Sequence, residues 1–102
     1  MDVTLLYFDD CPHWRLVDRR LHALAADLDV RVSYQVVSTP DDAEALVFHG
    51  SPTILIDGRD PFAHADQPIG LACRIYQTPS GPAGAPTIQQ LRSALNLTRD
   101  ER

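Results

Sequence analysis

The sequence predicts an α/β domain in which a mixed sheet is flanked by three helices. An apolar run over 3–8 is followed by a stripe with helical spacing and then by an alternating, strand-like run. The second half holds a short apolar run, a hairpin turn signal and a capped last helix. The 102 residues, 44% of them hydrophobic, suit one domain with its own core. We assign it residues 1–97 and expect the charged tail, 98–102, to fray.

The first half reads as a βαβ unit. Val3–Phe8 is almost wholly apolar, as in a strand buried on both faces. Asp9 and Asp10 end it, and Pro12 opens a helix that runs to about residue 28. Residues 30–37 then alternate between apolar and polar, which indicates a half-exposed strand at a sheet edge. The apolar stripe of the helix consists of Trp14, Val17, Leu21, Leu24 and Leu28.

A second helix is predicted from the cap Thr39 to a stop at Gly50. Residues 53–56 form a short buried strand, and Asp57-Gly58 is a hairpin signal. Its return strand is delayed by an insertion, 59–70, whose charged side chains Arg59, Asp60 and Asp66 we expect to face solvent. The return strand is predicted at 71–76, followed by a Gly/Pro loop at 78–86. The capping box Thr87 with Gln90 starts the last helix, with apolar positions Ile88, Leu91 and Leu95.

Composition excludes several classes of function. The net charge is −5 and all nine basic residues are arginine, so no basic patch suits a phosphate backbone and nucleic acid is not expected as a partner. No run is long enough for a membrane span, and no basic, apolar leader precedes the first strand, so we expect a cytoplasmic protein. Two cysteines and four scattered histidines make neither a disulfide framework nor a metal site, and no cofactor is predicted.

Two local motifs carry a resemblance to a known family. Cys11-Pro12-His13-Trp14 lies at the turn from the first strand to the first helix, and Gly50–Gly58 (GSPTILIDG) spans the third strand. The first resembles the Cys-Pro-His-Cys motif of thioredoxin-like disulfide oxidoreductases, with tryptophan at the second cysteine. The second resembles that family's cis-proline strand. The resemblance covers residues 3–58 well and 71–97 by element type, and it implies a four-stranded sheet in the order 2-1-3-4.

The resemblance implies a site around Cys11. A thiol at a helix N-terminus meets unpaired N–H groups and the positive end of the helix dipole, which favour the thiolate, although Asp9 and Asp10 oppose it. A cis Pro52 would turn the backbone of Ser51 toward a substrate bound beside Cys11. We expect Cys11 to be exposed and to be the faster-reacting cysteine. Pro12, His13, Trp14, Ser51 and Pro52 are the expected substrate-binding residues.

Two of these residues have competing interpretations. Trp14 belongs to the apolar stripe of its helix, so a packing role competes with a substrate-stacking role. It also cannot act as the second thiol of the motif. His13 donates to the sulfur or adds positive charge in one interpretation and is simply solvated in the other.

Cys73 also has two interpretations. It alternates with Leu71 and Ile75, which predicts a core-facing residue. Alternatively it is the catalytic partner of Cys11. In a simple hairpin Cys73 would lie about 13 Å short of the Cys11 end of the sheet, at about 3.3 Å per residue. A disulfide needs Cα atoms within roughly 7 Å, and the insertion leaves the register open.

Three functions therefore remain. The first is a thiol-disulfide oxidoreductase that uses Cys11 with a resolving thiol, either the distant Cys73 or an external small thiol, on a disulfide-bearing substrate. The second is organomercurial-lyase-like or soft-metal thiolate chemistry with the same two cysteines, although the acid expected after the first cysteine is replaced by Trp14. The third is a non-enzymatic thioredoxin-like binding module.

Overall fold

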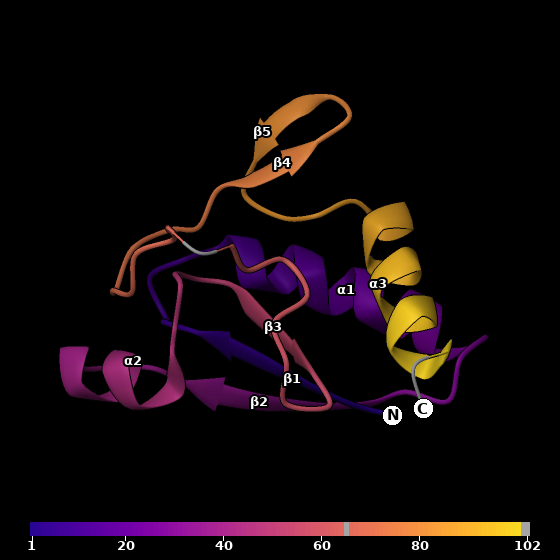
Figure 1. Cartoon of the computed structure of the whole chain (residues 1–102), viewed down its shortest axis with the longest axis horizontal. Coiled ribbons are helices and arrows are strands. Elements are labelled where there is room, and N and C mark those ends of the chain that lie inside the picture. The colour runs from indigo at the N-terminus through magenta and orange to yellow at the C-terminus, as the bar shows by residue number, and fades with distance from the viewer. Residues whose placement is uncertain (65, 101–102) are drawn as a thin grey trace.

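The chain alternates strands and helices over its first half and ends in a hairpin and a long helix (Figure 1). The computed structural model describes residues 1–64 and 66–100. Its elements are β1 (Asp2–Tyr7), α1 (His13–Ala25), β2 (Arg31–Val36), α2 (Pro40–Leu46), β3 (Thr53–Ile56), β4 (Tyr76–Thr78), β5 (Gly81–Ala83) and α3 (Ile88–Asp100).

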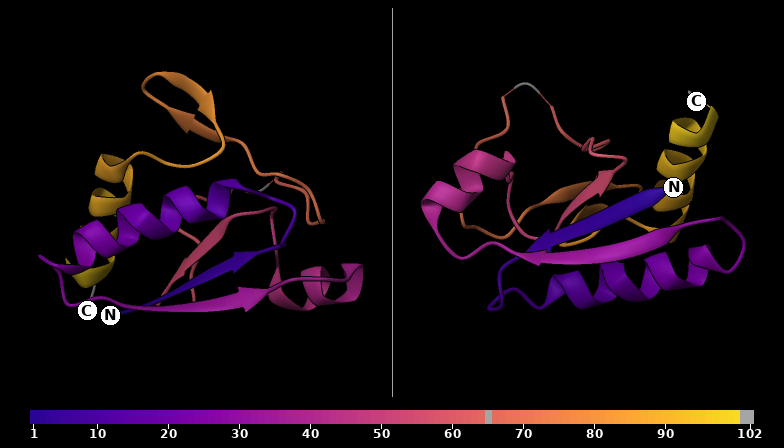
Figure 2. Two further views of the ribbon diagram at one scale, coloured as in Figure 1. Left: turned by 180° about the vertical axis from the view of Figure 1, so that it is seen from behind. Right: turned by 90° about the horizontal axis from the view of Figure 1, so that it is seen from below.

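The main sheet has three strands in the order β2-β1-β3. β1 runs parallel to β2, with Val3 opposite Val32, and antiparallel to β3, with Leu5 opposite Ile54. The parallel pair confirms the predicted βαβ unit, and the antiparallel β3 makes the sheet mixed, as predicted. The predicted four-stranded sheet in the order 2-1-3-4 is wrong, because β4 pairs with β5 in a separate two-stranded sheet. That hairpin stands off the body of the molecule (Figures 1 and 2).

Alternation along the strands divides the core into two layers. Val3 and Leu5 of β1 face α1 and α3, whereas Leu6 faces α2 and the buried Phe48. The first and last helices therefore share one face and the middle helix covers the other. Figure 2 shows α1 and α2 on opposite sides of the strands. β2 is an edge strand, as predicted, but its burial does not follow the alternating pattern, because the apolar Tyr34 and Val36 are 46% and 42% exposed.

The helix caps follow the sequence closely. Thr39 accepts a hydrogen bond from the Asp42 backbone N–H at 3.1 Å, as an N-cap should. Thr87 and Gln90 form the reciprocal capping box, at 2.8 and 3.1 Å. α2 ends earlier than predicted, because Val47, at φ 53°, takes the left-handed cap conformation that we assigned to Gly50.

The chain after β3 departs most from the prediction. Asp57-Gly58 forms the expected tight turn, with φ of 51° and 84°, but only one bridge, between Ile56 and Arg59, follows it. The predicted strand over 71–76 does not extend the sheet. Residues 72–74 instead cross beside Ser51 in a single parallel bridge, and the predicted 78–86 loop contains β5.

The C-terminal part of the chain continues α3 through Thr98 to Asp100, while residues 101 and 102 lie outside the described residues. Fraying of the 98–102 tail stays a prediction. None of the helices in 1–64 and 66–100 combines the length and apolarity that crossing a membrane requires.

Candidate functional site

The turn between β1 and α1 places Cys11 directly before the first helix. Its backbone N–H donates to the Phe8 carbonyl at 3.1 Å, and Pro12 takes the N-cap position. The Cys11 side chain is wholly buried, and its Sγ donates to the Ser51 carbonyl oxygen at 3.4 Å. The predicted position of Cys11 is therefore confirmed, but its predicted exposure is wrong, because the segment 72–74 covers it.

The Ser51–Pro52 peptide bond is cis, as the resemblance implies. Both residues are buried, and the Ser51 carbonyl contacts the Cys11 sulfur. The backbone of Ser51 faces the chain's own residues 72–74. Its N–H donates to the Ala72 carbonyl at 2.8 Å, and its carbonyl accepts from the Arg74 N–H at 2.9 Å. The backbone groups expected to face a substrate are thus already paired within the chain.

This pairing brings Cys73 to Cys11. The Cys73 Sγ lies 3.7 Å from the Cys11 Sγ, and both cysteines are free thiols. The 13 Å expected between Cys73 and the active-site end is wrong, because the segment crosses at Ser51 rather than returning beside β3. Cys73 is exposed, so the two sulfurs differ sharply in accessibility although they are in contact.

The face that residues 71–76 present to the core is the reverse of the predicted one. Cys73 and Ile75 are exposed, Ile75 at 59%, whereas Arg74 and Tyr76 are buried at 3% and 4%. A shift of one residue in an extended segment exchanges its two faces. The core-facing interpretation of Cys73 is therefore wrong.

A buried ion pair explains why Arg74 can point inward. Its guanidinium donates to both carboxylate oxygens of Asp60, at 2.8 and 3.3 Å, and the two side chains are only 1% and 10% exposed. Thr53 and Gln67 accept further hydrogen bonds from it at 3.4 Å. The expectation that Asp60 faces solvent is wrong, whereas Asp66 is exposed as predicted. The sequence analysis did not predict this ion pair. The signal that could have revealed it is Arg74, an arginine inside an otherwise apolar run.

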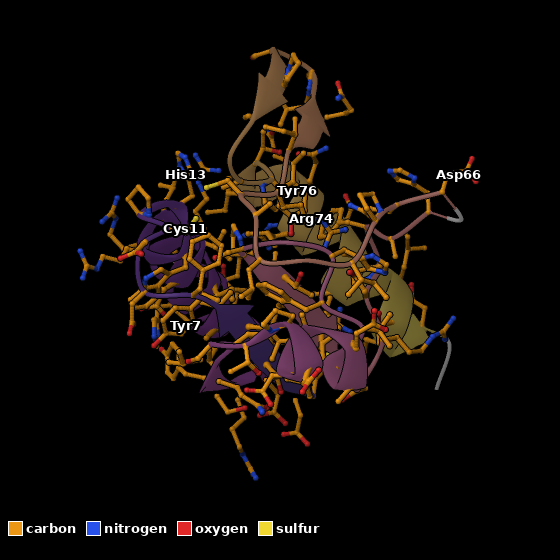
Figure 3. The ribbon with its side chains drawn as sticks, turned by 90° about the vertical axis from the view of Figure 1, so that its left-hand side faces the viewer. Tyr7, Cys11, His13, Asp66, Arg74 and Tyr76 are labelled. Carbon is orange, nitrogen blue, oxygen red and sulfur yellow. The ribbon has the colours of Figure 1, made fainter. Side chains whose placement is uncertain are left out.

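Tyr76 fastens the same segment to the cis-proline. Its hydroxyl donates to the Pro52 carbonyl, its ring lies under the Arg74 guanidinium at 4.6 Å, and Phe62 meets it edge-on at 5.4 Å. Burial raises the pKa of Tyr76 above its ordinary value, so the hydroxyl stays a donor. Figure 3 shows Arg74 and Tyr76 in view between Cys11 and the loop that carries Asp66. The buried side chains of Arg74 and Tyr76 therefore anchor the segment that carries the exposed Cys73.

The remaining motif residues contact the fold rather than the sulfurs. The His13 ring lies against Gly84, where an added Cβ would come within 2.5 Å of it, and no described hydrogen bond joins it to either cysteine. Trp14 stacks on Tyr7, with ring centroids 4.1 Å apart, and packs against the core. This favours the packing interpretation of Trp14. Pro12 is exposed.

The two thiols are electrostatically linked. The hydrogen bond from Cys73 to the Cys11 sulfur raises the pKa of Cys73, and burial and the charge of Cys11 act in the same direction. The contact thus holds the proton on Cys73 and leaves Cys11 as the acceptor. A disulfide that accepts two electrons can convert these two thiols into one Cys11–Cys73 disulfide, once the sulfurs approach from 3.7 Å to about 2.05 Å.

One hollow of the structure adjoins Cys73 and a larger one does not. A groove of about 350 Å³ runs past Cys73, between the chain at His49-Gly50 and the residues 67–75. A larger hollow of about 410 Å³ lies between Asp60–Phe62 and α3, and no cysteine lines it. We therefore place the site at the two sulfurs.

Metal ligands beyond the two sulfurs are lacking in the described ranges, where no three His, Cys, Asp or Glu side chains gather around one point.

No family model, no curated protein and no solved structure matches this chain.

Proposed function

We propose that this protein carries out thiol-disulfide exchange, with Cys11 and Cys73 as a two-electron dithiol pair, as a variant of the thioredoxin-like family. The observation that carries the proposal is the 3.7 Å contact between the sulfurs of two cysteines 62 positions apart. Chance rarely brings two free thiols together beside a helix start and a cis-proline. Family membership is supported by the parallel β1-α1-β2 unit, the antiparallel β3 and the cis bond before it.

Exposure decides which sulfur reacts first. Cys11 is wholly buried, so a substrate disulfide reaches Cys73, not Cys11 as the motif alone suggests. Cys73 must first give up the proton that its raised pKa favours keeping. Its thiolate then attacks one substrate sulfur, the substrate S–S bond breaks, and the first substrate thiolate leaves and takes up that proton. A mixed disulfide on Cys73 remains.

Cys11 then resolves the mixed disulfide. Its thiolate attacks the Cys73 sulfur, the bond from Cys73 to the substrate breaks, and the second substrate thiolate leaves with the proton that Cys11 gives up. The products are two substrate thiols and a Cys11–Cys73 disulfide, so two electrons pass from the protein to the substrate. Attack within one chain is fast because the effective concentration of a contacting thiol is very high. Cys73 thus supplies the second thiol that Trp14 cannot.

A chromogenic aromatic disulfide tests this scheme. The reduced wild-type protein should release two coloured thiolates per chain and end as an internal disulfide without an adduct. Cys11→Ser should release one and keep an adduct on Cys73, whereas Cys73→Ser should react slowly, because Cys11 is buried. A wild-type protein that ends with an adduct on each cysteine would overturn the proposal.

The alternative that the same contact favours is soft-metal binding. Two adjacent thiolates suit Cu(I) or Hg(II), which accept sulfur ligands in low coordination numbers. Titration of the reduced protein with Hg(II) separates the two functions. Binding of one ion by both thiols, in a protein whose cysteines never pair under mild oxidation, would favour the metal function.

A further inference from the structure

We propose that the outer edge of residues 71–75 binds the substrate as an extended polypeptide, one whose disulfide is flanked by apolar and basic residues. The inference rests on the proposed exchange function and names its substrate class. It is carried by the backbone, the side chains and the charges around Cys73.

The backbone at Cys73 has a free edge. In the parallel bridge, Ser51 pairs with the carbonyl of Ala72 and the N–H of Arg74. Because backbone groups alternate in direction along an extended chain, the N–H and carbonyl of Cys73 point away from Ser51. No residue of the described chain hydrogen-bonds to them. Unpaired edge groups of this kind accept an added strand.

The side chains on that edge are apolar. Leu71 and Ile75 are 39% and 59% exposed and lie two residues before and after Cys73, with Leu71 in the bend at residues 70–72. Ile69, also 39% exposed, lines the adjoining groove of about 350 Å³. Apolar side chains gathered around a reactive residue mark a binding surface rather than ordinary solvent-facing positions. A peptide with apolar residues beside its cysteine fits this edge.

The charges disfavour a small anionic disulfide. Arg74 lines the groove, but its guanidinium is buried against Asp60. At the Leu71 end, a second hollow of about 320 Å³ is lined by the exposed Asp9 and Asp10. These carboxylates repel an acidic ligand and attract a basic residue.

Strand pairing also places the substrate sulfur close to the sulfur of Cys73. Residues directly opposite each other on paired strands have Cβ atoms about 4.5–5.5 Å apart. A substrate half-cystine opposite Cys73 therefore has its sulfur within reach of the Cys73 Sγ. The same strand pairing therefore binds the peptide and aligns the two sulfurs for exchange.

Matched peptide disulfides test the inference. Rate constants for exchange with the reduced protein are measured for three substrates: a peptide disulfide with leucine and arginine flanks, the same peptide with leucine and glutamate flanks, and the small chromogenic disulfide. We expect the arginine peptide to react faster than the glutamate peptide by about tenfold at low salt, with the ratio falling as salt is added. N-methylation of the half-cystine's own backbone nitrogen, which faces the Cys73 carbonyl in an antiparallel pair, should slow exchange with the arginine peptide.

Surface variants locate the contact. Ile75→Ser should lower the ratio of the arginine-peptide rate to the small-disulfide rate by about tenfold, the loss expected for one apolar contact. The matched control is Leu97→Ser, at a 65% exposed leucine on α3, which should leave that ratio unchanged. A peptide rate that is insensitive to the flanking residues, to N-methylation and to Ile75→Ser, while the small disulfide still reacts, overturns the inference alone. No exchange with any disulfide overturns the proposed function.

Discussion

Local sequence determines the structure of residues 1–58, whereas contacts with distant residues determine that of residues 59–86. In the first region each element forms where its own residues predict it: β1 from an apolar run, α1 from a spaced stripe, α2 from the Thr39 cap. In the second region the backbone is held by partners far away in sequence. Cys73 is placed by Ser51, and Arg74 is placed by Asp60 and Thr53.

The difference shows how the site is assembled. The first region supplies a framework that holds the buried Cys11 thiol beside the buried backbone carbonyl of Ser51. The second region brings the exposed thiol, Cys73, and holds it there with a buried ion pair and the Tyr76 hydroxyl. Disturbing the second region should therefore separate the sulfurs while the sheet persists.

The largest effect is expected from breaking the ion pair. Asp60→Asn leaves the Arg74 guanidinium buried without a counter-charge, which should cost about 3 kcal/mol of unfolding free energy. It should also slow formation of the Cys11–Cys73 disulfide, because residues 72–74 lose their anchor. Urea unfolding measures the first effect, and mass spectrometry after timed oxidation measures the second.

The control for this variant is Asp66→Asn, which removes an exposed carboxylate from the same segment. It should change stability by less than about 0.5 kcal/mol. Equal effects of the two substitutions would mean that the Asp60–Arg74 pair does not hold the segment.

The sequence predicted the frame well, because its signals are local. The strand, helix, strand order of the first half predicted the parallel pairing of β1 with β2, and the Thr87/Gln90 box located the start of α3. The candidate site was predicted only in part. Cys11 and the cis-proline follow from short motifs at their own positions, whereas the contact with Cys73 depends on where a distant segment crosses.

The error at residues 71–76 has a definite physical source. The pattern Leu71, Cys73, Ile75 predicts an apolar face toward the core, and an arginine between them counts against the other face. That penalty disappears once Asp60 supplies a buried carboxylate. Since Asp60 lies 14 positions away, in an irregular segment, no periodicity could reveal the compensation.

A smaller effect should follow from adding a methyl group at Gly50, where the two regions are in contact. Gly50 has φ +109°, and a Cβ there would lie 2.9 Å from the Ala72 carbonyl oxygen. Gly50→Ala should cost about 1–3 kcal/mol and push residues 72–74 away from Ser51, which slows disulfide formation. Urea unfolding and the oxidation time course measure both effects.

Gly58→Ala is the matched control for Gly50→Ala. Its φ is also positive, at +84°, but nothing lies within 4 Å of the added Cβ. It should lose stability by backbone strain alone and form the Cys11–Cys73 disulfide at the wild-type rate. Equal oxidation rates for the two variants would argue against a steric contact between the regions.

The smallest effect is expected from a carboxylate hydrogen bond on the surface of the first region. Tyr34 on β2 donates to Asp18 of α1 at 2.6 Å, and His22 contacts the same hydroxyl at 2.9 Å. The hydrogen bond to Asp18, with some burial and the Asp18 charge, raises the pKa of Tyr34 to about 12. Asp18 resembles Asp60 as a carboxylate partner, but its partner Tyr34 is 46% exposed, whereas Arg74 is buried.

Tyr34→Phe should therefore cost less than about 1 kcal/mol, well below the cost of Asp60→Asn. The sign of its pH dependence follows from the raised pKa. The neutral phenol is favoured in the folded state, so its contribution is present below pH 10 and declines as the pH rises toward about 12. Urea unfolding of both proteins at about pH 8 and about pH 11 measures this, and the difference between them should shrink at the higher value. A difference that does not change with pH would contradict the raised pKa of Tyr34. A cost larger than that of Asp60→Asn would contradict the view that burial, rather than the carboxylate itself, makes the second region's contact strong.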